Sequence, residues 1–295
     1  MDCEQLAIER FRAASDMSLK NYGKPLVVCI SGGKDSSTIT ELAIRAGIPC
    51  EFQHEHTTAD APETVRFVRS EFKRLEEKGY KCTVNLPTYK GGRTSMWALI
   101  PQKLMPPTRT VRYCCSILKE GGGAGRFIAT GARWAESASR RNNRGVYEKI
   151  SQDKDRRIIL KNDNDDKRQL FENCRLKAKR VVNPIIDWED DEIIEFNADA
   201  KVPLNLLYGC GFRRVGCIGC PMGGKHGREK EFLRWPKYKQ LYINAFERMN
   251  AVRNARGLQK EWRTGTDVFN WWMEYDVIPG QVDLFDDWEN PDWNG

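Results

Sequence analysis

The stretch LVVCI-SGGKDSS-TITELAIRAG, Leu26 to Gly47, decides the fold. Its first five residues, 26–30, are all apolar and predict a short, fully buried strand. A glycine turn over 31–36 follows, and apolar residues then recur at helical spacing until Gly47 ends the element. A strand, a glycine turn and a helix in this order direct backbone N–H groups and the positive helix end at an anion. The stretch therefore predicts an anion-binding loop, to which Lys34 adds a charge.

The turn differs from the Walker A loop, which has four residues between its first glycine and the Gly-Lys pair. SGGKDS instead resembles the PP-loop of the ATP pyrophosphatases, enzymes that split ATP between the α and β phosphates. The resemblance implies that the loop holds the leaving pyrophosphate, with Asp35 near its Mg²⁺. The alternative is a tight strand-to-helix turn with a surface lysine, which a lone Gly-Gly pair would favour.

Strands and helices alternate along the following chain. This alternation predicts an α/β fold, with a doubly wound, mostly parallel sheet whose ligands bind beyond the carboxyl ends of the strands. We expect a nucleotide-binding domain over 1–200 and a cysteine loop with a helical C-terminal extension over 201–295. The further predicted elements are helices over 4–20 and 114–120, strands over 50–57, 80–86, 126–130 and 180–186, a helix from about 189 to 198, a long loop over 87–112, a polar hairpin or mobile excursion over 150–172, and helices near 228–256 and 265–275.

The composition indicates a cytoplasmic protein. No apolar run approaches the ~20 residues of a membrane span, and the N-terminal sequence MDCEQLAIERF lacks the apolar core of a signal peptide, so we expect no membrane contact. The ten cysteines are then interpreted as thiols or metal ligands.

The net charge of +7 is unevenly distributed. Residues 133–180 hold fifteen Lys and Arg against eight Asp and Glu, whereas residues 274–295 hold seven acids and no Lys or Arg. A basic middle suits a polyanion, so we expect a nucleic-acid substrate to bind there. The alternative is a solvated, salt-bridged surface, because acids are mixed into the same segment.

Four cysteines stand out by their spacing: Cys114 and Cys115 are adjacent, and Cys217 and Cys220 form a C-x-x-C turn. A C-x-x-C turn brings two thiolates to one small ion or cluster. An adjacent pair suits a tetrahedral zinc poorly, because neighbouring side chains diverge, but it suits two irons of a larger cluster. Cys210 is a substitute ligand or a reactive thiol, if it has either role.

At this point the chain resembles the PAPS reductase family of adenine-nucleotide α-hydrolase folds. The matching motifs span most of residues 25–245: SGGKDS, TTADAPET, GARWAES with Arg140, NPIIDWEDDEI and LYGCGFRRVGCIGCP. In the APS reductases of this family a Cys-Cys pair and a C-x-x-C bind a [4Fe-4S] cluster. The resemblance therefore implies a [4Fe-4S] cluster on Cys114, Cys115, Cys217 and Cys220, and zinc remains the alternative.

Two departures from the sulfonucleotide reductases concern the reaction. Those enzymes end in a mobile nucleophilic cysteine, whereas no cysteine follows Cys220 in this sequence. Their phosphate loop is also usually degenerate, whereas SGGKDS is intact. Both departures favour ATP-consuming chemistry, as in the tRNA thiolases and DNA-phosphorothioation proteins, members of which combine the intact loop with a [4Fe-4S] cluster. The resemblance then implies adenylation of an acceptor, nucleic acid in our interpretation, and sulfur delivered by a cysteine desulfurase or another thiol donor protein.

Two other functions remain open. One is an APS or PAPS reductase that releases sulfite with an external thiol, and the other is a nucleotide-binding redox module without turnover. The oligomeric state, a homodimer included, is equally open.

Candidate residues follow from these motifs. We expect catalytic roles for Lys34, Asp35, Arg133 and Arg140. The residues expected to bind ATP and its Mg²⁺ are Ser31, Gly32, Gly33, Lys34, Asp35, Ser36, Thr58, Asp60, Gly131, Arg133, Glu136 and Ser137. Asp187 is interpreted as a helix cap. The three histidines, His54, His56 and His226, show no spacing that indicates a zinc site or a triad and are interpreted as structural or peripheral.

Overall fold

The computed structural model describes residues 2–121, 123, 125–150, 157–165, 168, 171, 179–258 and 262–275. The chain divides into two compact units: unit 1 contains 1–96 and 112–220, and unit 2 contains 97–111 and 221–295. The domain boundary expected after residue 200 stays a prediction. The chain runs from unit 1 into unit 2, returns to unit 1 and then enters unit 2 again. Much of the expected 150–172 excursion, Cys174 and the acidic end beyond Tyr275 lie outside the described residues.

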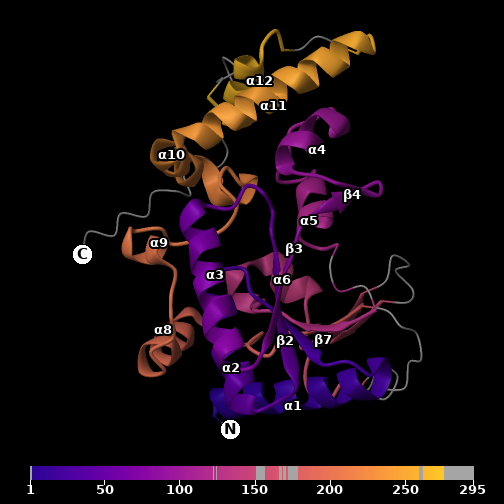
Figure 1. Ribbon diagram of the computed structural model, residues 1–295, viewed down its shortest axis with the longest axis vertical. Helices are drawn as coiled ribbons and strands as arrows, with labels where there is room; N and C mark the ends of the chain where they lie inside the picture. Colours follow the sequence, from indigo (N-terminus) through magenta and orange to yellow (C-terminus); the bar gives the residue numbers. More distant parts are fainter. Residues whose placement is uncertain are drawn as a thin grey trace. The chain divides into compact units, whose positions relative to one another are not determined.

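Unit 1 is built on a seven-stranded sheet in the order β3-β2-β1-β6-β9-β7-β8 (Figure 1). The strands from β3 to β9 are mutually parallel, and β7 pairs antiparallel with both β9 and β8. The predicted α/β fold with a mostly parallel sheet is therefore confirmed. The strands are β1 (Leu26–Cys29), β2 (Cys50–Glu55), β3 (Lys81–Asn85), β6 (Phe127–Ala129), β7 (Tyr147–Ile150), β8 (Ile158–Leu160) and β9 (Lys179–Val182).

Helices lie on both sides of this sheet. Those of unit 1 are α1 (Cys3–Tyr22), α2 (Lys34–Ala46), α3 (Pro62–Glu77), α5 (Tyr113–Leu118), the 3₁₀ helix η1 (Trp134–Glu136), α6 (Ala138–Asn143), α8 (Asp190–Asp199) and α9 (Leu206–Gly209). The segment expected as a long loop over 87–112 instead contains a small hairpin, β4 (Thr88–Tyr89) with β5 (Gly92–Arg93), and helix α4 (Met96–Lys103).

The core of unit 1 follows from the apolar patterns of β1 and its neighbouring helices. Alternate residues of β1 face opposite sides of the sheet, so Leu26 and Val28 join the main apolar cluster with residues of α1, α2, α3 and α8. Val27 joins a smaller cluster with Ile128 and Val181 on the other face. Burying each such side chain stabilises the fold by about 1.5–3 kcal/mol, which fixes the strand that leads into the glycine turn.

A buried arginine joins α1 to the segment before α8. Arg10 is 4% exposed and forms ion pairs with Asp163 at 2.9 Å and Asp187 at 2.7 Å. Asp187 was expected to cap the helix, but the N-cap of α8 is Glu189, which forms a capping box with Glu192. The interpretation of Asp187 as the cap is therefore wrong, because its carboxylate is engaged by Arg10.

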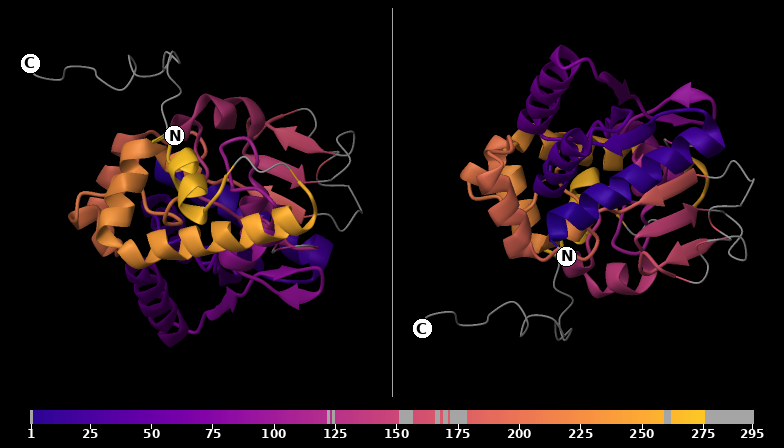
Figure 2. Two further views of the ribbon diagram at one scale, coloured as in Figure 1. Left: turned by 90° about the horizontal axis from the view of Figure 1, so that it is seen from above. Right: turned by 90° about the horizontal axis from the view of Figure 1, so that it is seen from below.

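Unit 2 is helical and rich in aromatic residues. Its helices are α10 (Gly224–Arg234), α11 (Pro236–Ala255) and α12 (Gly265–Trp272), with most of α4. Helix α12 packs against α11, and the left view of Figure 2 shows it as the short yellow helix beside the long α11. Tyr242 and Trp272 are at the centre of their contact, with ring centroids 4.7 Å apart. The helix predicted over 228–256 is divided at Pro236, which begins α11 because proline has no N–H to continue α10. None of the described helices combines the length and apolar character that a membrane span requires.

Candidate functional site

The predicted phosphate loop connects the carboxyl end of β1 to the N-terminus of α2. Gly33 is the N-cap of α2, and no side chain hydrogen-bonds to the first turn from that position. Gly32 has φ of 83°, and a Cβ there would lie 2.7 Å from Thr64 Cγ2. Only glycine fits both the conformation and the space. The glycine turn and the helix start that the sequence predicted are therefore present, whereas the binding of an anion there stays a prediction.

A segment far along the chain closes over this loop. The Tyr208 hydroxyl accepts a hydrogen bond of 2.8 Å from the Lys34 N–H. The Asn205 amide donates to the Gly32 carbonyl at 3.3 Å and to the Thr64 hydroxyl at 3.0 Å. The sequence analysis missed Tyr208 and Asn205 as loop partners, although both lie within or beside the quoted LYGCGF motif.

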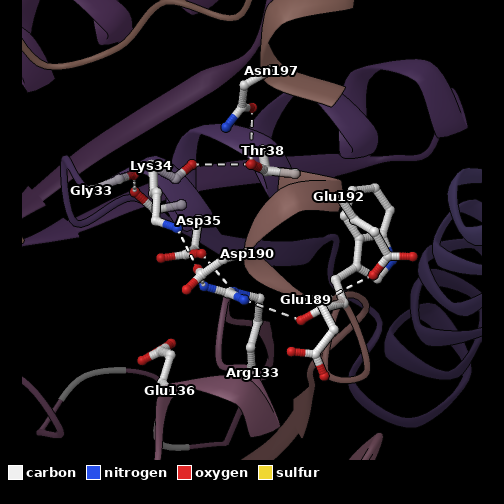
Figure 3. A network of polar contacts seen from close by, with 12 residues as sticks. Gly33, Lys34, Asp35, Thr38, Arg133, Glu136, Glu189, Asp190, Glu192 and Asn197 are labelled. Atoms are coloured by element: carbon white, nitrogen blue, oxygen red, sulfur yellow. Dashed lines mark hydrogen bonds and ion pairs between the residues drawn. The ribbon is translucent and has the colours of Figure 1, made fainter. Parts of the chain in front are cut away.

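Two of the three cations predicted to be catalytic, Lys34 and Arg133, meet at one carboxylate (Figure 3). Lys34 Nζ and Arg133 Nη2 both lie 2.6 Å from Asp190 Oδ1. Arg133, only 2% exposed, also donates from Nε to Asp35 at 2.7 Å and from Nη1 to the Trp188 carbonyl at 3.1 Å. Three predicted residues are therefore brought together, and Asp190 is the residue that the prediction missed.

These contacts set the charges of the group. Hydrogen bonds from Lys34 and then from Arg133 lower the pKa of Asp190 below its ordinary value. Burial disfavours the charged form of Arg133, but Asp35 and Asp190 outweigh it and raise the pKa of the guanidinium. The group thus consists of two carboxylates and two cations, and the cations are of the kind that holds phosphate oxygens.

The GARWAES segment approaches the start of α2 closely. A Cβ on Gly131 would lie 2.9 Å from the Asp35 carbonyl carbon, so glycine is required for the approach. Glu136 and Arg140 form an ion pair with each other. Burial raises the pKa of Glu136 and lowers the pKa of Arg140. The Ser137 hydroxyl caps α6 by accepting from the Arg140 N–H, so its only described role is in the helix end.

Thr58 and Asp60 lie in the turn between β2 and α3. Thr58 has φ of 64°, and its hydroxyl accepts from the Met96 N–H at 2.9 Å. Asp60 accepts from the Thr57 N–H at 2.7 Å and lies 3.3 Å from His56 Nδ1. Both side chains hold the turn itself, and their predicted contact with the nucleotide stays a prediction.

The same turn holds the C-x-x-C loop. Asp60 and Cys217 form an isolated antiparallel bridge, and the Ile218 N–H donates to the Ala59 carbonyl at 2.8 Å. The Cys217 thiol lies 3.3 Å from the Thr57 hydroxyl. The C-x-x-C loop is therefore attached to the turn that follows β2. Strand β2 lies next to β1, which leads into the phosphate loop.

The adjacent pair Cys114 and Cys115 lies in the first turn of α5, directly after Tyr113. A hydrogen bond from Cys114 lowers the pKa of Cys115 to about 5, and Arg112, 3.4 Å from its sulfur, assists. The pKa of Cys114 is raised mainly by Cys115 and burial, and also by the negative charges of Cys217 and Cys220. All four predicted cysteines thus act on one another within unit 1, a convergence that contiguous sequence does not reveal.

The four thiols suit either of two kinds of metal site. Around a single zinc with Zn–S bonds of about 2.3 Å, tetrahedral sulfurs lie about 3.8 Å apart. Within the described residues, no three cysteine sulfurs lie within 4.8 Å of one another. Thiolates are also the usual ligands of iron–sulfur clusters. Lys119 lies near enough for Cys217 to raise its pKa, so a cation balances this thiol group.

An open pocket of about 610 Å³ lies in the basic part of unit 1. It is lined by Trp134, Arg141, Asn142, Lys161 and Glu189. Lys161 Nζ donates to three backbone carbonyls, those of Arg141, Asn142 and Arg144. The pocket combines an aromatic face with positive charge next to the segment that carries Arg133.

Comparison with known families identifies the domain. A family described as the phosphoadenosine phosphosulfate reductase domain matches residues 25–222, which include the phosphate loop and all four cysteines. The chain belongs to this family. The family resemblance seen in the sequence motifs is thereby confirmed.

Two curated relatives are considerably longer than this chain. Uncharacterized protein MJ0973 of Methanocaldococcus jannaschii is 26% identical over 242 residues, covering 82% of this chain and 51% of that protein. Uncharacterized protein MJ0066 of the same organism is 24% identical, covering 77% and 43%. The chain spans about half the length of these two relatives. An adenosine 5'-phosphosulfate reductase of Deinococcus radiodurans is 34% identical over 58 residues, 20% of this chain.

Solved structures resemble this family member in fold. The phosphoadenylyl-sulfate reductase of Candida auris has a TM-score of 0.45 and 13% identity, covering 72% of this chain and 87% of that chain. The U34-tRNA thiolase NcsA of Methanococcus maripaludis, solved with its [4Fe-4S] cluster, has a TM-score of 0.41 and 12% identity, covering 86% and 82%. At these scores neither structure bears on the activity of this chain.

Proposed function

We propose that the chain is a sulfurtransferase that uses ATP to adenylate an acceptor, which then receives sulfur. The observation that carries the proposal is the intact glycine loop at the start of α2, with Lys34 and Arg133 converging beside it. In the proposed reaction an acceptor oxygen attacks the α-phosphorus of ATP, and pyrophosphate leaves with the β and γ phosphates. A sulfur nucleophile then attacks the carbon that bears the adenylated oxygen, so that a C–S bond forms, the C–O bond breaks and AMP leaves with that oxygen. If the nucleophile is a persulfide, a second thiol reduces its S–S bond to release the thiolated product.

The residues of the loop supply binding and charge neutralisation in this proposal. The α2 N-terminus and Lys34 hold the leaving pyrophosphate, and Arg133 neutralises charge that develops at the α-phosphate. Asp35 and Asp190 hold Arg133 in position through two hydrogen bonds of 2.7 and 2.6 Å. Mg²⁺ would accompany the phosphates, with Asp35 as its nearest candidate carboxylate. Positioning and preorganised charge carry most of the acceleration in such transfers.

We propose an iron–sulfur cluster on the cysteines, with zinc as the alternative. Cys114, Cys115, Cys217 and Cys220 would hold it, because the negative charges of the other three all raise the pKa of Cys114 and an adjacent Cys-Cys pair suits two irons of a larger cluster. A [4Fe-4S] cluster would supply a site that binds sulfur close to the nucleotide. Arg112 at 3.4 Å from Cys115, and Lys119, offset the negative charge of four thiolates.

A nucleic acid is the acceptor that we propose. The open pocket beside the Arg133 segment offers Trp134 for stacking, with Arg141 for phosphates. The sequence excess of seven positive charges over 133–180 favours the same class of partner. A cysteine desulfurase or another thiol donor protein would deliver the sulfur, and a cytoplasmic location would suit both partners.

The test begins with anaerobically purified protein, counted for iron and sulfide, and a pyrophosphate-release assay with ATP, Mg²⁺ and either total tRNA or duplex DNA. We expect about four irons per chain and pyrophosphate release that depends on nucleic acid. Lys34→Ala should lower the rate by about 100-fold or more, because it removes a preorganised charge. Lys24→Ala, an exposed lysine before β1, is the matched control and should keep the rate.

A sulfonucleotide reductase is the second candidate, favoured by the short matches to adenosine 5'-phosphosulfate reductases. It predicts sulfite release from APS or PAPS with an added thiol protein, in the absence of ATP. Sulfite without pyrophosphate would replace the thiolation proposal with this one. Nucleotide binding without either product would instead indicate a redox module. Zinc in place of iron would refute the cluster.

A further inference from the structure

Three side chains that the sequence analysis treated separately meet at the end of β2. The ligand atoms of His54, His56 and Asp60 all lie within 4.8 Å of one another, and no other group of this kind occurs in the described part of the chain. His54 and His56 are two residues apart in extended chain, so they share one face of the strand. The turn over 57–60 then returns Asp60 to the same face, 3.3 Å from His56 Nδ1.

His54 presents an unpaired nitrogen in a buried position. The residue is 4% exposed, and its Nδ1 lies 2.8 Å from the Ile30 carbonyl oxygen. Because a carbonyl only accepts, Nδ1 carries the proton and Nε2 keeps its lone pair. Nε2 is buried and has no hydrogen-bond partner. An imidazole that donates one N–H to a backbone carbonyl and keeps the other nitrogen free is the usual arrangement of a metal-ligating histidine.

The His56–Asp60 contact has the spacing of two ligands on one ion. Two ligand atoms at about 2.1 Å from a metal and at a tetrahedral angle lie about 3.4 Å apart. The observed separation between Nδ1 and Oδ2 is 3.3 Å. Asp60 Oδ2 is also oriented by the Thr57 N–H at 2.7 Å, as ligating carboxylates commonly are.

We propose that His54, His56 and Asp60 bind one divalent transition-metal ion of the Zn²⁺ or Fe²⁺ class. Two imidazoles and one carboxylate suit such ions, and three protein ligands leave at least one coordination position for water or substrate. The site is distinct from the four cysteines, although the Asp60–Cys217 bridge connects the two. His54 of this site is hydrogen-bonded through Nδ1 to the carbonyl oxygen of Ile30, the residue before the phosphate loop. The proposal does not depend on the function proposed above.

The test uses Co²⁺ as the probe metal, added to the full-length, metal-free chain under anaerobic conditions. A site of nitrogen and oxygen ligands gives visible d–d bands without a thiolate-to-cobalt charge-transfer band. Because the four cysteines of a metal-free chain would themselves bind Co²⁺ and give a thiolate band, the spectrum is recorded on a Cys114→Ser, Cys217→Ser double variant. In this variant we expect one equivalent of Co²⁺ with nitrogen and oxygen ligands alone. Competition by Zn²⁺ should remove the bands.

Variants assign the ligands. Asp60→Asn and His54→Asn should weaken Co²⁺ binding by about 100-fold or more, and His54→Asn retains a donor for the Ile30 carbonyl. His56→Ala changes the least buried of the three and guards against a folding failure, which far-UV circular dichroism monitors. The matched control is His226→Ala, the remaining histidine of the chain, which is exposed on α10 and should bind as wild type. Three outcomes would each overturn the proposal. They are a spectrum that contains thiolate bands alone, equal Co²⁺ binding by all of the ligand variants, and no Co²⁺ binding by the folded protein that carries the three intact ligands.

Discussion

Lys34 of the phosphate loop and Asp190 of α8 form an ion pair, with 2.6 Å between Nζ and Oδ1, although 156 residues separate them in sequence. Arg133 shares the same oxygen. The Asp190 carboxylate is therefore paired with Lys34 and Arg133, the two cations that we expect to bind phosphate. Because Asp190 is 70% exposed, a phosphate group from solvent is able to compete with it.

Removing this carboxylate should favour anion binding. We expect Asp190→Asn to tighten the binding of Mg²⁺–pyrophosphate by about two- to fivefold, since an exposed ion pair contributes up to about 1 kcal/mol. Titration calorimetry at two salt concentrations measures the change, which should shrink at high salt. Asp191→Asn removes the same charge from the next residue and should have little effect. Weaker binding by Asp190→Asn would instead mean that Asp190 positions Lys34 for the ligand.

The same variant tests the pH dependence of stability. Lys34 and Arg133 lower the pKa of Asp190 below its ordinary value of 3.8, so the folded state favours the ionised form. The contribution of Asp190 to stability is therefore present above 3.8 and is lost as the pH falls through the lower, folded-state pKa. We expect the melting temperature of wild type to exceed that of Asp190→Asn near pH 6, and the difference to vanish at the lowest pH. A difference that persists there would contradict the assignment.

The close approach at Gly131 should not tolerate a side chain. A Cβ would lie 2.9 Å from both the carbonyl carbon and oxygen of Asp35, and backbone atoms at a helix start cannot easily move. We expect Gly131→Ala to destabilise the protein by about 1–3 kcal/mol and to weaken nucleotide binding. Chemical denaturation and ATP titration measure the two effects. Gly209→Ala is the control, because its Cβ would meet no atom within 4 Å, and equal behaviour of the two variants would refute the steric explanation.

The cysteine ligands should differ from their neighbour in the same loop. We expect Cys114→Ser or Cys217→Ser to lose more than half of the bound iron, because a hydroxyl replaces a soft thiolate. Cys210→Ser should retain it, since Cys210 is exposed and was only a substitute candidate. Iron and sulfide analysis after anaerobic purification provides the measurement. If Cys210→Ser loses iron and Cys217→Ser retains it, Cys210 would be the ligand and Cys217 would not.

The fold was largely predictable because its signals are local. The run over 26–47 contains a strand, its turn and its helix within one contiguous stretch, and β1 and α2 form there. The segment over 87–112 was not predicted, because its hairpin and α4 are short and their apolar residues are interrupted by Pro and Gly. The antiparallel strand β7 was also missed, since its stability comes from pairing with the distant β9.

The sequence by itself determined the family, the α/β fold and the position of the glycine turn between strand and helix, because each depends on spacing within a short motif. Only the tertiary structure decided which charges oppose one another and which ligands converge. Asp190 reaches Lys34, and Cys217 reaches Asp60, because the sheet order brings strand ends and the loops beyond them to a common edge. Side-chain pairing over such separations is set by packing, and no local pattern encodes it.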